Sequence, residues 1–138
     1  MYLLTRLTDD ERADRLMSEK ALNSRVMYRA KKHGWRVLRM QRAMVAGEWR
    51  TPATKGFPDL LLVGPTVMFR ELKKELGKLS SDQEQWRDAL IAAGADWGIW
   101  RPSDLRRGRV VAQLTGSRAR SSISTQRPSP IMEQEEQS

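Results

Sequence analysis

The sequence contains no cysteine and only one histidine, His33. The absence of cysteine excludes disulfides, zinc–thiolate sites and thiol nucleophiles. His33 has no second histidine with which to share a metal, and its place before Gly34 favours a position at the end of a helix. The sequence also lacks an apolar run long enough to span a bilayer and a basic-then-apolar leader at its start. These absences predict a protein of the reducing cytoplasm that has no membrane partner.

Positive charge is concentrated in one part of the sequence. The formal net charge is +8, and residues 20–55 carry ten Lys or Arg against one acid, Glu48. Such a field attracts polyphosphate, because each neutralised phosphate releases condensed counterions. The same charges also fit a solvated helix face in a basic protein, and Trp49 fits either base stacking or a sheet edge. For nucleic-acid contact we single out Lys31, Lys32, Arg39, Arg42, Arg50, Lys55, Lys74 and Lys78.

The first structured segment is predicted to be helical. The capping box that begins at Thr8 and ends at Glu11 starts a helix. This helix continues, with a break near Ser18, to a stop at His33-Gly34. Its apolar stripe comprises Leu22, Val26 and Ala30, and Glu19 lies on the same stripe because it precedes Val26 by nearly two turns. A carboxylate that faces the core in this way needs a partner.

The remaining pattern predicts a small α/β fold, with a mixed sheet of about four strands flanked by helices. Apolar alternation or apolar runs mark a strand at 35–40, a hairpin around Gly64-Pro65-Thr66 and a strand at 95–101. A second helix begins at a capping box of Ser80 and Gln83 and stops at Gly94. Residues 41–55 are predicted to form a basic loop, and 104–114 either a helix or an edge strand. Residues 1–114 then form one domain, and 115–138 a disordered polar tail.

The hairpin places charge at the end of an apolar face. A three-residue turn pairs Val63 with Val67 and sets Asp59 opposite Glu71, where two like charges are destabilising. A divalent cation between the two carboxylates would relieve that repulsion, and Lys73 follows on the same face within reach of a metal-bound water. An even-length turn would instead send the two acids to opposite faces.

Two further polar side chains are predicted to approach this place. Glu19 offers a third inward carboxylate, and the amide of Gln83 points toward the sheet because it shares a helix face with Trp86 and Leu90. Helix capping by Gln83 would by itself explain that residue.

Several blocks of the sequence together resemble a known family. Pro58-Asp59 followed by Glu71-Leu72-Lys73 is similar to the PD-(D/E)xK signature of a nuclease superfamily, and the surrounding sequence resembles its VRR-NUC branch. The resemblance covers roughly residues 18–114. The blocks that carry it are the helix with Glu19, Gly56 through Leu60, Glu71 through Lys73, Gly77 through Gln83, and Ala93 through Pro102.

This resemblance implies a restriction-endonuclease-like core and a phosphodiesterase that requires Mg²⁺ or Mn²⁺. Asp59, Glu71 and the backbone carbonyl of Leu72 would hold the metal, and Glu19 would complete the site directly or through water. Lys73 would orient or help to deprotonate the attacking water, and Gln83 would position Lys73 or the phosphate.

In the same branch, stand-alone viral and bacterial domains act on branched DNA such as four-way junctions, often as homodimers. For a viral protein the compartment would be the host bacterium's cytoplasm. The sequence leaves open a nuclease that cuts RNA and a basic nucleic-acid-binding module that does not cut. The presence of Asp59, Glu71 and Lys73 together favours the enzyme.

Overall fold

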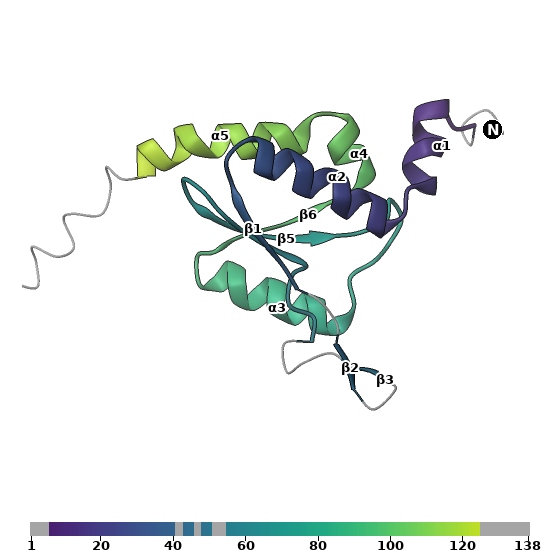
Figure 1. The fold of residues 1–138 in the computed structure, drawn as a ribbon, viewed down its shortest axis with the longest axis horizontal. Helices are drawn as coiled ribbons and strands as arrows, with labels where there is room; N and C mark the ends of the chain where they lie inside the picture. The colour runs from purple at the N-terminus through teal and green to yellow at the C-terminus, as the bar shows by residue number, and fades with distance from the viewer. Residues whose placement is uncertain (1–5, 41–42, 46–47, 51–54, 125–138) are drawn as a thin grey trace, which may run out of the picture.

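The computed structural model describes residues 6–40, 43–45, 48–50 and 55–124. Its centre is a four-stranded mixed sheet in the order β1-β4-β5-β6 (Figure 1). The first three strands pair antiparallel, and β6 pairs parallel with β5. The strands are β1 (Arg36–Arg39), β4 (Leu60–Val63), β5 (Val67–Leu72) and β6 (Asp96–Trp100).

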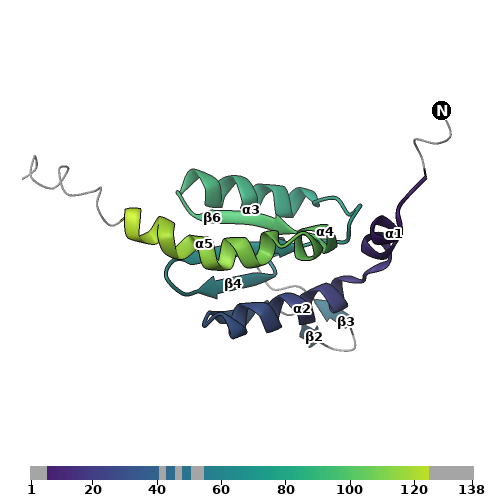
Figure 2. The same cartoon turned by 90° about the horizontal axis from the view of Figure 1, so that it is seen from above.

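Helices cover both faces of this sheet. Figure 1 shows α2, α4 and α5 on one face and α3 on the other, and from above α2 and α5 run side by side (Figure 2). This arrangement confirms the predicted small α/β fold with a mixed four-stranded sheet. The helices are α1 (Asp9–Leu16), α2 (Glu19–Lys32), α3 (Ser81–Ala92), α4 (Pro102–Arg106) and α5 (Arg109–Ser124).

Local capping explains where these helices begin and end. Thr8 and Glu11 form the predicted capping box of α1, and Ser18 caps α2 after the predicted break. Gly34 and Gly94 follow α2 and α3 with positive φ, which glycine adopts without steric cost.

The main core lies between the sheet and the layer of α2 and α5. Trp35 anchors this layer, because its indole N–H donates a hydrogen bond of 3.1 Å to the carbonyl of Leu114 in α5. The buried hydrophobic side chains are Leu22, Val26, Ala30, Trp35, Leu60, Leu62, Met68, Leu72, Trp100, Val110 and Leu114.

Arg70 is an unpredicted charged residue in this core. It is 4% exposed, and its guanidinium lies over the Trp100 ring and donates to Gln113 of α5 and to the carbonyl and carboxylate of Asp96. These partners replace the water that burial removes, so Arg70 ties α5 to the sheet.

The structure decides one open prediction and corrects another. Residues 102–114 form helices and not an edge strand, and Gly108, with φ of +82°, separates α4 from α5. The basic segment was predicted as a loop, but β2 (Ala43–Val45) and β3 (Glu48–Arg50) pair there as a separate two-stranded sheet. Cross-strand pairing of such short segments leaves no clear period in the sequence. Arg42 lies outside the described residues, as do the side chains of Trp49 and Arg50.

The C-terminal boundary also differs from the prediction. Helix α5 continues through Ser124, so the boundary placed after Leu114 falls inside a helix. The rest of the predicted tail, residues 125–138, lies outside the described residues. Among the described residues, no helix is long and apolar enough to cross a membrane.

Candidate active site

The hairpin register brings the two predicted acids together. Val63 pairs with Val67 and Leu60 with Arg70, so the same register places Asp59 opposite Glu71 just beyond the end of the ladder. The carboxylate of Asp59 accepts a hydrogen bond of 2.8 Å from the backbone N–H of Leu72. The three-residue turn predicted from the sequence is therefore confirmed, and the even-length alternative is wrong.

Helix α3 also holds Glu71, through its residue Gln83. The Gln83 Nε2 donates to Glu71 Oε2 at 2.6 Å, while Gln83 Oε1 accepts the backbone N–H of Ser80 at 2.8 Å. Gln83 therefore caps α3 and also donates a hydrogen bond to Glu71. The side chain performs both roles considered from the sequence, the helix cap and the contact toward the sheet.

The environment of Glu71 opposes its negative charge. The side chain is only 2% exposed. Burial is the largest cause that raises the pKa of Glu71, and the charge of Asp59 and a hydrogen bond with it raise the pKa further, to about 9. A bound cation would favour the ionised form of both acids, because it supplies the opposite charge that the pair lacks.

Two more predicted residues act on the same carboxylate. The charge of Lys73 lowers the pKa of Glu71, and the charge of Glu19 raises it. Lys73 is half-buried, and its backbone N–H donates to the carbonyl of Trp100 at 3.2 Å. The prediction that Glu19 faces the core is wrong, because Glu19 is the first residue of α2 and its side chain is exposed.

Asn23 is a polar residue of α2 that the sequence analysis missed. It is 6% exposed, and its Oδ1 has no hydrogen-bond partner among the described residues. Asn23 follows Glu19 by four residues, so the two lie on the same side of α2, and helical side chains tilt toward the helix N-terminus. The signal in the sequence was an amide on the apolar stripe of Leu22 and Val26.

The donor set fits a magnesium-like cation. Two carboxylates, Asp59 and Glu71, meet at the end of β5, and Leu72 supplies backbone atoms between Glu71 and Lys73. Within the described ranges no group of three or more His, Cys, Asp or Glu side chains is placed to hold a metal ion. Mg²⁺ is commonly bound by one or two carboxylates, with waters and substrate phosphates as the other ligands.

The predicted nucleic-acid contacts divide into two groups. Lys74 follows Lys73 directly and Lys78 follows it by five residues, and Arg39 pairs with Leu60, the neighbour of Asp59. Exposed Lys55 lies near them and forms an ion pair of 3.6 Å with Asp82 of α3.

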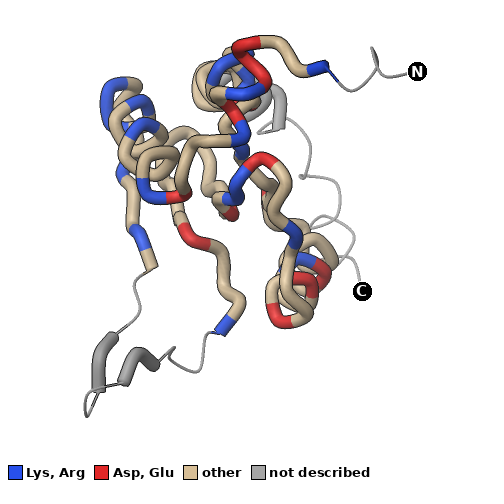
Figure 3. Tube along the Cα trace, turned by 90° about the vertical axis from the view of Figure 1, so that its right-hand side faces the viewer, with Lys and Arg blue, Asp and Glu red and all other residues tan. Residues whose placement is uncertain are grey.

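The second group lies away from the acids. Lys31 and Lys32 are exposed near the C-terminal end of α2, about 18 Å along the helix from Glu19 at 1.5 Å per residue. In Figure 3 the blue basic positions gather along α2, whereas red acidic positions mark α3. Only the first group is therefore brought to the acid pair.

Comparisons of the chain with protein-family models, with curated proteins and with solved structures find no match.

Proposed function

We propose that this protein is a metal-dependent endonuclease that hydrolyses phosphodiester bonds in branched DNA, such as four-way junctions or flaps. The observation that carries the proposal is the pairing of Asp59 with buried Glu71, with the charge of Lys73 beside them. Two acids that repel one another at a partly covered site are stabilised by a hard dication.

Each residue has a defined task in this proposal. Asp59, Glu71 and the Leu72 carbonyl hold Mg²⁺ or Mn²⁺, which supplies Lewis acidity and lowers the pKa of bound water. Lys73 orients the attacking water and offsets negative charge on the phosphate. Gln83 fixes the rotamer of Glu71 through its hydrogen bond, and Glu19 completes the site directly or through water.

Basic side chains around the site would hold the DNA backbone. Arg39, Lys55, Lys74 and Lys78 are exposed near the acid pair and can contact phosphates. Contacts of this kind fix the position of a strand and leave its sequence unread. The proposal accordingly predicts selection by DNA shape rather than by base sequence, in the cytoplasm during repair or recombination.

The test is cleavage of a four-way junction, a flap and a plain duplex with Mg²⁺, Mn²⁺ or EDTA. We expect metal-dependent cutting that Lys73→Ala abolishes while binding is kept, whereas Arg107→Ala, which removes an exposed charge elsewhere, cuts normally. Binding without cutting in any metal would favour a non-catalytic nucleic-acid-binding module. Matched RNA substrates decide between the two nucleic acids.

A homodimer is part of the same proposal, since cutting two strands symmetrically needs two sites related by a two-fold axis. One sheet face offers a surface for a second copy, because Leu38, Val63 and Val67 remain 57%, 42% and 46% exposed. Light scattering should then give twice the chain mass, and Val67→Asp should give the mass of one chain. A wild-type monomer at assay concentration would remove the dimer from the proposal.

A further inference from the structure

A groove lies beside α2, and neither residue of the acid pair lines it. Its walls are α2 on one side and the α1 and α4 helices on the other, and it encloses about 500 Å³. The side chains used below are Asp14, Arg25, Tyr28, Arg29 and Arg106, all of which line this groove. None of the residues that line this groove has a role in the proposed hydrolysis.

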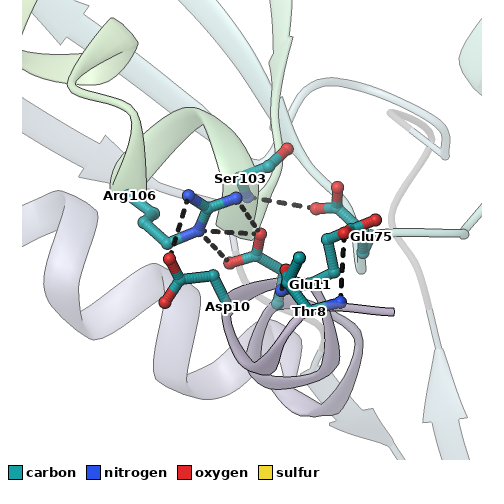
Figure 4. Close-up of polar contacts among 7 residues, drawn as sticks. Thr8, Asp10, Glu11, Glu75, Ser103 and Arg106 are labelled. Carbon is teal, nitrogen blue, oxygen red and sulfur yellow. Dashed lines mark hydrogen bonds and ion pairs between the residues drawn. The ribbon is translucent and has the colours of Figure 1, made fainter. Parts of the chain in front are cut away.

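The net positive charge of the groove comes from two arginines of α2. Arg25 and Arg29 are four residues apart on α2 and so lie on one side of the helix. On the opposite wall the charge of Arg106 is balanced, because its Nη2 contacts Asp14 at 2.7 Å and its Nη1 lies 3.8 Å from Asp10 (Figure 4). No ion pair within the described ranges engages Arg25 or Arg29, so these two residues give the groove its net charge.

An aromatic ring stands at the rim between these two charges. Tyr28 is 63% exposed and lines the groove. The Nζ of Lys32 lies 5.9 Å from the centre of the ring. Exposed aromatic rings flanked by cations are platforms on which unpaired bases stack while the cations hold the backbone.

We propose that this groove binds a single-stranded DNA segment that continues from the substrate bound at the acid pair. The substrate of the proposed endonuclease would then carry an unpaired arm, so this inference rests on the proposed function. Helix α2 begins at Glu19, and the α4 wall of the groove contacts the chain just beyond Lys73, because the backbone N–H of Ser103 donates to Glu75 Oε1 at 3.0 Å. Arg25 and Arg29 lie about 9 and 15 Å beyond Glu19 along the helix at 1.5 Å per residue. Those distances correspond to about three to four stacked nucleotides at 3.4 Å each.

The test measures binding of a fluorescent 12-nucleotide single strand and a blunt duplex in EDTA, by anisotropy at several salt concentrations. Arg25→Ala/Arg29→Ala should lower the slope of log affinity against log salt by about 1.4 for the single strand, at about 0.7 per lost phosphate contact. Tyr28→Leu should weaken single-strand binding by about five- to hundredfold. Duplex binding should change by less than about twofold in Tyr28→Leu, because bases in a duplex are already stacked on one another and cannot stack on the ring.

The matched control is Arg36→Ala/Arg107→Ala, which removes two exposed charges outside the groove. Circular dichroism melts verify that each variant is folded. Unchanged single-strand binding in both groove variants would overturn the inference, as would an equal loss in the control. Stronger competition by a polyglutamate peptide than by single-stranded DNA would also overturn it, in favour of an acidic protein ligand.

Cleavage assays on the same variants separate this inference from the proposed function. If the wild type cuts flaps and the groove variants bind single strands normally, the groove inference fails and the nuclease stands. If the wild type cuts nothing but the groove variants lose single-strand binding, the nuclease fails and strand binding stands.

Discussion

Gln83 donates from Nε2 to Oε2 of Glu71 at 2.6 Å. The same side chain caps α3 through Ser80, so the position of one helix end is coupled to the rotamer of a buried acid. An ordinary capping residue would need only the second contact. The arrangement fixes Glu71 where it faces Asp59.

The Gln83→Glu variant separates these two roles. Glutamate preserves the capping box, because its oxygen still accepts from Ser80, but it cannot donate to Glu71 when ionised. We expect a loss of about 1 to 3 kcal/mol in the free energy of unfolding at pH 8, and a smaller loss at pH 5, measured by urea denaturation. Gln85→Glu, on the exposed side of the same helix, is the control. Equal stability of the two variants at pH 8 would show that the contact with Glu71 contributes nothing.

Glu71 should make the metal-free protein less stable as pH rises. Its pKa is raised to about 9 in the folded state, against an ordinary value of 4.5. The folded state therefore holds a proton in this window that the unfolded state has lost, and the free energy of unfolding decreases from pH 5 to pH 9. Glu71→Gln removes this contribution and should melt at a higher temperature than wild type at pH 8 in EDTA. If the melting temperatures of the two proteins changed equally with pH across that range, the raised pKa of Glu71 would be contradicted.

The junction of α1 and α4 should depend on one ion pair. Asp14 is 4% exposed, and Arg106 contacts it through two nitrogens. Arg106→Ala leaves this carboxylate buried without a donor, so we expect the free energy of unfolding to decrease by more than it does in Arg107→Ala. Asp14→Ala/Arg106→Ala should recover part of that loss in denaturant titrations. A loss for Arg106→Ala no larger than that for Arg107→Ala would mean that the pair does not hold α1.

Asn23 should matter more for activity than for folding. Its Oδ1 is buried without a partner among the described residues, so Asn23→Leu removes an unsatisfied acceptor and should leave stability unchanged or raised by about 1 kcal/mol. If the amide orders water or Lys73 in the working site, the same variant should cut at least about tenfold more slowly. Rates equal to wild type in a stable Asn23→Leu protein would make Asn23 a packing residue only.

The local parts of this site could be predicted from the sequence. The turn at Gly64-Pro65-Thr66 fixes the register of the hairpin, and the period of two then determines which face carries Asp59 and Glu71. The cap at Ser80 was also readable, since it depends on residues three positions apart.

The parts that the sequence did not reveal depend on tertiary contacts. Arg106 meets Asp14 across a separation of 92 residues, and the partners of buried Arg70 include Gln113, which α5 brings to it. Glu19 lies on the predicted stripe but is exposed, because a helix period does not show where the layer beneath the helix ends. The contacts and exposure of these residues follow from the packed structure and not from the local sequence.

The proposed function requires that Asp59 and Glu71 share a divalent cation. The most direct measurement is anomalous scattering from a crystal soaked in Mn²⁺. We predict one strong peak between the two carboxylates, with oxygen distances of about 2.0 to 2.3 Å, that is lost in Asp59→Asn. A map with no peak at this position, or with manganese bound only elsewhere, would contradict the account.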